Sequence, residues 1–152
     1  MKARPELQPT LREASTNVLE TMFFADAEPA HGAVHSDAVA CSLLCTGAEE
    51  GSFKVAIDRA ALLLLCEAFF GEDDEPGMIR ELELLCELTN MLAGSTLSAY
   101  APDHLCPLST PQLCDVAAHS ATLAMPMHRT ATANFAIDGG LISVSCALQA
   151  AA

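Results

Sequence analysis

The sequence is poor in aromatic residues and in positive charges. Aromatic side chains make up 5% of its 152 residues and tryptophan is absent, so leucine, alanine and valine must fill most of the core. Seven Lys and Arg residues stand against 20 Asp and Glu residues, which gives a formal net charge of -13. A surface with so few cations cannot neutralise a series of phosphates, so binding to nucleic acid or to an anionic membrane is not expected.

Patterns typical of disulfides and metal sites are also lacking. The seven cysteines are an odd number and include no C-x-x-C pair. The set His104, Cys106, Cys114 and His119 matches no standard zinc spacing, so no metal site is predicted. Four cysteines occupy apolar stretches and are expected to be small buried side chains in a reducing compartment, namely Cys41, Cys45, Cys66 and Cys86.

No segment has the length of a membrane span. The longest apolar run, "AALLLLCEAFF", is too short to cross a bilayer and contains Glu67. The stretch "MKARPELQPTLRE" at the start has no apolar core of the kind found in signal peptides. We therefore expect a cytoplasmic protein. A chain of 152 residues, 51% of them hydrophobic, suits a single domain over residues 1–152.

Hydrophobic periodicity predicts a helix and a hairpin at the start of the chain. The run "TLRE" has the form of a capping box made by Thr10 and Glu13, so the first helix should begin there and end near Phe24. Residues 38–46 and 52–57 then alternate as strands do, and the polar turn "GAEEG" joins them. These residues should form an antiparallel hairpin.

Two further helices are predicted after the hairpin. Asp58 should cap a helix over "RAALLLLCEAFF", which Gly71 ends. A longer helix should run from about Gly77 to Tyr100. The three prolines of the next stretch, "APDHLCPLSTP", exclude a central strand from residues 101–111.

The last part of the chain has the period of β-strands. Three strands are predicted, the last two joined by the turn "DGG", over residues 121–129, 132–137 and 141–149. A helix followed by an antiparallel meander thus appears twice. This order predicts an α+β fold, with a pseudo-duplicated antiparallel sheet and helices packed on one side. Such a sheet retains an unpaired edge, so a symmetric homodimer is expected.

The long helix carries a polar pair. At about a hundred degrees per residue, one side collects the residues expected to meet the sheet, which are Leu82, Leu85, Cys86, Thr89, Leu92 and Ala93. The opposite side collects Arg80, Glu83, Glu87, Asn90, Gly94 and Ser98. Glu87 and Asn90 are three positions apart on the helix, so both side chains can contact the same partner. Leu84 and Met91 should form an apolar rim, and Gly94 leaves a gap beyond Asn90, as on a docking surface.

Spacing alone leaves plainer interpretations open. Most exposed Glu/Asn pairs on helices are only solvated, and Gly94 can equally serve the close packing of helices. The chain could also be an oligomerising α+β domain whose polar stripe faces solvent. The pattern E-x-x-N is short and does not decide between these possibilities.

Four stretches together resemble a known family. In order and spacing they are similar to the CheX-type chemotaxis phosphatases, which form a group with CheC and the middle domain of the flagellar switch protein FliM. The stretches are "EASTNVLETMFFADAEP", "GSFKVAIDRAALLLLCEAFFGED", "ELLCELTNMLAGSTLSAY" and "LSTPQL". The resemblance covers about residues 8–149, and its most specific part is E-x-x-N-M-x-x-G followed by a proline about twenty residues later.

The resemblance implies a function for the polar pair. In the family, the Glu and Asn of the motif insert into the active site of a phosphorylated CheY-like receiver, and they correspond to Glu87 and Asn90. Pro111 corresponds to the motif proline, at a spacing slightly shorter than usual. Glu83, Met91 and Gly94 are the further residues expected to contact the partner. CheC-like relatives carry a second E-x-x-N on the first helix. Here Glu13 and Asn17 are one position too far apart, which favours the single-site CheX type.

The expected reaction is hydrolysis of an aspartyl phosphate on the receiver. Asn90 would orient the attacking water, because a carboxamide both donates and accepts hydrogen bonds without titrating. Glu87 would pair with a lysine of the receiver. The chain needs no cofactor of its own, because the magnesium ion is expected on the receiver. The alternative is a module of the same fold that binds a receiver or a flagellar switch protein without hydrolysing anything.

Overall fold

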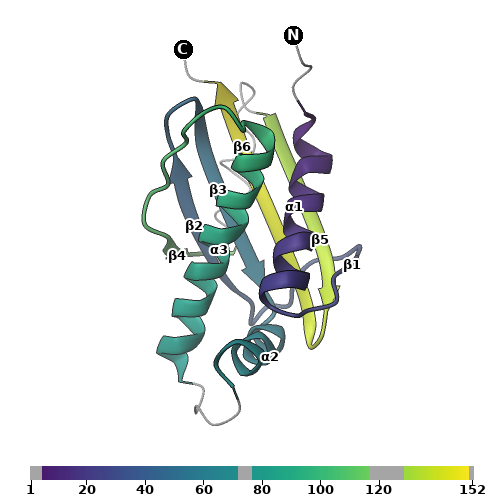
Figure 1. Ribbon diagram of the computed structural model, residues 1–152. Coiled ribbons are helices and arrows are strands. Elements are labelled where there is room, and N and C mark those ends of the chain that lie inside the picture. Colours follow the sequence, from purple (N-terminus) through teal and green to yellow (C-terminus); the bar gives the residue numbers. More distant parts are fainter. Residues whose placement is uncertain (1–4, 72–76, 117–128, 151–152) are drawn as a thin grey trace.

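The computed structural model describes residues 5–71, 77–116 and 129–150, and within them six antiparallel strands form one sheet beside three helices (Figure 1). The elements are α1 (Leu7–Met22), β1 (Glu28–Pro29), β2 (Val39–Cys45), β3 (Glu49–Ile57), α2 (Arg59–Phe70), α3 (Met78–Tyr100), β4 (Gln112–Cys114), β5 (Arg129–Ile137) and β6 (Gly140–Ala150). Helices α1 and α3 lie side by side on one face of the sheet, and α2 lies at its end. The predicted α+β class is confirmed.

The strand order shows the predicted duplication. The sheet runs β1-β5-β6-β3-β2-β4. If β1 is exchanged with β4, β2 with β5 and β3 with β6, the same order is obtained in reverse. Each half therefore consists of a helix, a short strand and a hairpin, and the short strand of each half pairs with the hairpin of the other half. The two halves interlock along the sheet.

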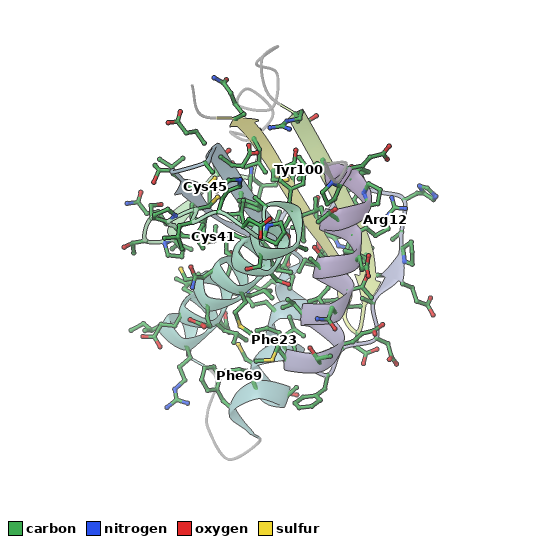
Figure 2. The ribbon with its side chains drawn as sticks, turned by 45° about the horizontal axis from the view of Figure 1, so that its top comes forward. Arg12, Phe23, Cys41, Cys45, Phe69 and Tyr100 are labelled. Carbon is green, nitrogen blue, oxygen red and sulfur yellow. The ribbon has the colours of Figure 1, made fainter. Side chains whose placement is uncertain are left out.

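The core lies between the sheet and the helices α1 and α3. Four neighbouring residues on the covered face of paired strands are at most 1% exposed, namely Cys41, Val55, Val144 and Ala133. The outer two positions carry small side chains, Cys41 on β2 and Ala133 on β5. These let α3 approach β2 and α1 approach β5. Large leucines fill the remaining space, and each contributes roughly 1.5–3 kcal/mol through burial. At the lower end, Phe23 after α1 stacks on Phe69 of α2, with ring centroids 5.5 Å apart (Figure 2).

The predicted start of the first helix is wrong. The helix begins at Leu7 after Glu6, so Thr10 lies inside its first turn, and the Thr10 hydroxyl donates to the Glu6 carbonyl at 2.6 Å. A capping box with Glu13 is therefore absent. Pro9 fits this earlier start, because the backbone N–H groups of the first turn have no partner within the helix. The helix ends at Met22, two residues before the predicted end.

The hairpins are confirmed, with shifted bounds. Strand β3 begins at Glu49, because the pairing with β2 extends to Gly51 and that with β6 extends to Glu49. The predicted turn was therefore too long. Strands β5 and β6 contain the predicted segments 132–137 and 141–149. The predicted strand 121–129 lies outside the described residues except for Arg129, which begins β5.

Two short strands were not predicted. β1 and β4 have two and three residues, too few to show any periodicity. β4 covers the edge of β2. Near the opposite edge of the sheet, the Gln8 side chain pairs with the backbone of β5. Its amide nitrogen donates to the Thr132 carbonyl at 2.6 Å, and its carbonyl oxygen accepts from the Thr132 N–H at 3.0 Å. The homodimer expected from an unpaired edge stays a prediction.

Asp58 is the N-cap residue of α2, as predicted, but its side chain joins three segments instead of capping the helix. Its side chain makes no cap hydrogen bond. Its carboxylate instead accepts hydrogen bonds from the His35 N–H at 2.6 Å, the His35 Nδ1 at 2.8 Å and the Leu141 N–H at 2.8 Å. Gly140 is needed beside it, because a Cβ there would lie 2.6 Å from a carboxylate oxygen.

Among the described residues, no helix combines the length and the apolar character that a membrane crossing requires.

The substitution Asp58→Ala should destabilise the fold by about 1–3 kcal/mol, since it leaves the backbone N–H groups of His35 and Leu141 without their acceptor. Burial raises the pKa of Asp58, but the hydrogen bonds from His35 and Leu141 outweigh it and leave the pKa below its usual value. The stability that the carboxylate contributes is therefore present above about pH 4 and is lost as the pH falls through the lowered pKa. Urea unfolding at pH 7 and at pH 3 measures both effects. Asp37→Ala, at an exposed carboxylate, is the control and should change stability little.

Candidate functional site

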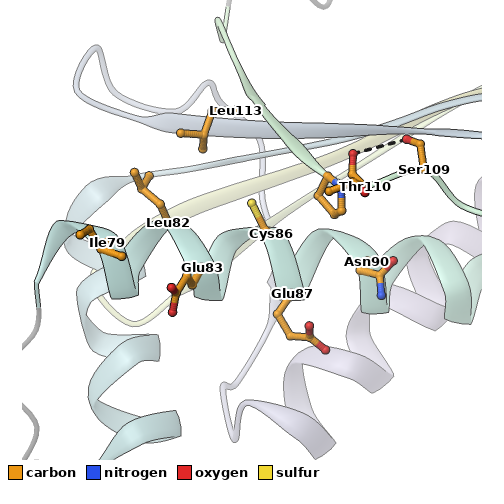
Figure 3. Close-up of a pocket in the computed structure, with 10 residues that line it drawn as sticks. Ile79, Leu82, Glu83, Cys86, Glu87, Asn90, Ser109, Thr110 and Leu113 are labelled. Atoms are coloured by element: carbon orange, nitrogen blue, oxygen red, sulfur yellow. Dashed lines mark hydrogen bonds between the residues drawn. The ribbon is translucent and has the colours of Figure 1, made fainter.

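A pocket lies between α3 and the segment that leads into β4 (Figure 3). Its volume is about 600 Å³. The residues that line it are Ile79, Leu82, Glu83, Cys86, Glu87 and Asn90 from α3, together with Ser109, Thr110, Pro111 and Leu113. One end of the pocket is apolar, and the other carries the predicted polar pair.

The pocket gathers four of the six predicted site residues. Glu83, Glu87 and Asn90 line it from α3, and Pro111 lines it from the opposite wall, which is distant in the sequence. Met91 does not line the pocket and packs half-buried against the core. Gly94 is half-buried as well, and a Cβ added there would meet nothing within 4 Å. The expected gap beyond Asn90 therefore exists, but outside the pocket.

The buried face of α3 fixes how the pair is presented. Leu85, Leu88 and Leu92 are fully buried in the core. The buried Thr89 hydroxyl donates to the Leu85 carbonyl at 2.7 Å, so this polar group has a partner inside the helix. Because this face points to the sheet, Asn90 and the carboxylates must point outward.

The predicted orientation of α3 needs one correction. Leu84 was expected at the apolar rim and is 1% exposed. Leu82 and Cys86 were expected against the sheet, yet they are half-buried and line the pocket. The reason is that α3 packs against α1 and α2 as well as the sheet. Its buried face is therefore turned away from β4, and the freed side forms the pocket wall.

The opposite wall is held to the edge of β2. The Leu44 N–H donates to the Ser109 hydroxyl at 2.8 Å, and the Ser109 N–H donates to the Leu44 carbonyl at 2.8 Å. Leu108 bridges to Cys45, and Gln112 pairs with Ser42. These backbone contacts hold Thr110 and Pro111 opposite α3 without any partner. Ser109, Thr110 and the apolar end were not predicted as site residues, because only the pairing with β2 brings them to the helix.

The polar pair is available for a partner. Glu87 and Asn90 are exposed, and neither side chain has a hydrogen bond or ion pair with another residue in the described part of the chain. Arg80, expected on the same stripe, lies with its guanidinium 5.1 Å from the centre of the Phe70 ring and does not line the pocket. Glu83 and Glu87 therefore give the pocket rim a negative charge.

The first helix has a hollow of its own. Glu13 and Asn17 line it together with Ala99 from the end of α3, and both side chains are exposed. This hollow lies between the two helices, whereas the pocket at Asn90 lies between a helix and an edge strand. The two places are therefore not equivalent under the pseudo-symmetry of the sheet.

Metal ligands are not gathered in the described residues. Within residues 5–71, 77–116 and 129–150, no group of three or more His, Cys, Asp or Glu side chains could hold a metal ion. His119, a member of the zinc set considered above, lies outside these ranges.

The chain matches a known protein family. Residues 39–133 match the family described as "Chemotaxis phosphatase CheX", and this match covers more than half of the chain. The chain belongs to the CheX family. A comparison with individual curated proteins finds no match.

Solved structures share the fold across nearly the whole chain. The CheX of Vibrio vulnificus is 18% identical with a TM-score of 0.75, covering 98% of this chain and 100% of that one. The CheX of Desulfovibrio desulfuricans is 19% identical with a TM-score of 0.72, covering 94% and 99%. The CheX in a CheX–CheY–BeF3–Mg complex from Borrelia burgdorferi is 18% identical with a TM-score of 0.66, covering 93% and 96%. At these identities the similarity establishes the fold.

Gly94→Ala should stabilise the protein by about 1 kcal/mol, because glycine inside a helix costs about that much against alanine and the added methyl group meets nothing. For a domain of this size the midpoint of thermal unfolding should rise by about 2–4 °C. The matched control is Gly51→Ala, whose added methyl group would collide with the Ala147 carbonyl oxygen and should lower the midpoint. A lower midpoint for Gly94→Ala would show that the space beyond Asn90 is not open.

Proposed function

We propose that this chain dephosphorylates the aspartyl phosphate of a CheY-like receiver domain, with Glu87 and Asn90 as the acting pair. The observation that carries the proposal is the geometry of this pair. Both side chains are exposed, lack partners among the described residues, and stand at a preformed pocket in a member of the CheX family. The complex of a structurally similar CheX with CheY supports a receiver as the partner.

Asn90 is suited to the chemical step. An aspartyl phosphate is already reactive, and phosphoryl transfer depends mainly on positioning and electrostatics. The carboxamide of Asn90 can orient a water in line with the phosphorus atom and remains neutral at any pH of interest. It cannot act as a general base, which suits a loose transition state in which the attacking water needs little deprotonation. The magnesium ion is expected on the receiver, so the chain needs no metal.

Glu87 is suited to docking. It lies one helical turn before Asn90, so both side chains can enter the same partner site. An exposed carboxylate at this place can pair with a cationic side chain of the receiver. Glu83 lies one turn further back and extends the negative rim. These carboxylates favour a partner that offers lysine or arginine beside its phosphorylated site.

The apolar end of the pocket extends the contact area. Ile79 is 74% exposed and Leu113 is 52% exposed, which leaves a large apolar surface beside the polar pair. Apolar surface of this kind gains free energy when a partner covers it. We propose that this apolar surface contacts the face of the receiver next to the receiver's own active site.

A binding module without catalysis is the second candidate. It would use the same pocket and the same docking carboxylate and would lack any effect on the lifetime of the phosphorylated receiver. The presence of Asn90 at the pocket favours the catalytic function, because binding alone does not require a carboxamide at this position.

Asn90→Ala should reduce the acceleration of phosphoryl-receiver decay about 100- to 1000-fold, the usual loss for one positioned polar group. The measurement is the decay of a radiolabelled phosphoryl group on each CheY-like receiver of the same organism, with and without the protein. Glu87→Gln should instead raise the protein concentration needed for half-maximal acceleration.

Asn17→Ala is the matched control, since it makes the same chemical change on an exposed helix surface outside the pocket. It should leave the decay unchanged. If the unmodified protein binds a phosphorylated receiver without shortening its lifetime, the chain is the binding module. If Asn90→Ala retains full acceleration, Asn90 does not position the water.

Leu113→Ser and Ile79→Ser should each weaken receiver binding about 10-fold, because the lost apolar contact is worth about 1.4 kcal/mol. Both side chains are exposed, so thermal unfolding should change little. Isothermal titration with the phosphorylated receiver measures the affinity. The control is Leu105→Ser, at a side chain that is 87% exposed and lies outside the pocket. Equal affinities for all three variants would show that the apolar end of the pocket is not part of the interface.

A further inference from the structure

Two cysteine thiols meet directly behind the pocket. Cys86 on α3 is half-buried and lines the pocket, where its side chain points toward the segment around β4 (Figure 3). Cys41 on β2 is fully buried beneath α3. The Cys41 thiol donates a hydrogen bond to the Cys86 sulfur across 3.5 Å. A thiol that solvent can reach through the pocket is therefore backed by a second thiol in the core.

The two thiols differ in their chemistry. Burial raises the pKa of Cys41 to about 12, although a contact with the Thr89 hydroxyl acts in the opposite direction. Cys41 therefore keeps its proton and can donate it to the neighbouring sulfur. Cys86 lines the pocket, so it is the thiol of the pair that an oxidant can reach, whereas Cys41 is fully buried. Cys86 is thus placed to react first and Cys41 to react second.

We propose that Cys41 and Cys86 are a redox-responsive pair that forms a reversible disulfide when a peroxide reaches the pocket. In the first step the Cys86 sulfur attacks one peroxide oxygen, the O–O bond breaks, and the products are a sulfenic acid and water. In the second step the Cys41 thiol passes its proton to the sulfenic hydroxyl while its sulfur attacks the Cys86 sulfur, and the S–O bond breaks. The hydroxyl group leaves with the Cys41 proton as water. Two thiols are oxidised and one peroxide is reduced.

The geometry of the pair suits the second step. A disulfide requires a sulfur separation of about 2.05 Å, so the two sulfurs must approach by about 1.5 Å. Cys86 lies at the pocket wall with Cys41 behind it, so a shift of the Cys86 sulfur away from the pocket would close this distance. The bond would link α3 to β2 at the residue before Glu87. The modification goes beyond the proposed function and does not depend on it.

The test exposes the intact, reduced protein to hydrogen peroxide, blocks the remaining thiols and measures the mass. One disulfide removes two hydrogens, about 2 Da, and leaves five thiols to be alkylated where the reduced protein has seven, and dithiothreitol should reverse both changes. Fragmentation of the digested protein should show a peptide with Cys41 joined to a peptide with Cys86. A bond between any other two cysteines, or seven alkylated thiols after treatment, would overturn the proposal.

Single substitutions separate the two roles. Cys86→Ser should abolish the loss of mass. Cys41→Ala should leave Cys86 without its partner, so that oxygen atoms add to Cys86 and the mass rises by about 16 or 32 Da. The matched controls are Cys106→Ser and Cys114→Ser, because these cysteines are half-buried like Cys86. Both controls should form the disulfide as the unmodified protein does. The map of the bond in the unmodified protein tests the proposal even if a variant folds poorly.

Discussion

The seating of α3 on the sheet is the constraint on which the candidate site depends. Leucines on one face of this helix are buried against the strands and against α1 and α2, and Leu85, Leu88 and Leu92 have no exposed surface. Rotation of the helix about its axis would expose these leucines at roughly 1.5–3 kcal/mol each. The direction of Glu87 and Asn90 is therefore set by apolar packing on the opposite side of the same helix. The helix that carries this pair needs no ordering when it meets a partner, so only the two exposed side chains must be fixed on binding.

The exchange of short strands between the halves supplies the second wall of the pocket. β4 belongs to the second half in sequence, yet it pairs with β2 of the first half. This pairing places Pro111 opposite a helix that precedes it by more than ten residues. The related position in the other half has only the two residues of β1, which pair near the end of β5 at Phe135 and Ala136. The pseudo-symmetric fold therefore holds an asymmetric surface, with the pocket at Asn90 lying between α3 and the edge strand β4.

The sequence predicts the parts of the fold that local periodicity determines. The bounds of α3 and the presence of the two long hairpins follow from apolar spacing, and the end of α2 follows from Gly71, whereas the exact bounds of the hairpin strands do not. Short strands cannot be predicted in this way, because the two residues of β1 become a strand only through pairing with β5. The role of Asp58 was missed for a similar reason, since its partners at His35 and Leu141 are distant in the chain. The pair Glu87 and Asn90 was found because both lie on one helix, whereas Ser109 and Thr110 reach it only through the edge of β2.

The acidic character of the chain gives a reason for an amide at the tip of the site. A carboxylate about 4 Å from a phosphoryl charge meets a repulsion of about 4 kcal/mol at an effective dielectric constant of 20. The net charge of -13 adds to this repulsion at longer range, although salt screens most of it. Asn90 avoids the repulsion because it is neutral. Glu87, one turn away, can keep its charge because it would face a cation of the partner. On the proposed function, the division between a neutral tip and a charged neighbour lets an acidic protein approach an acidic phosphorylated site.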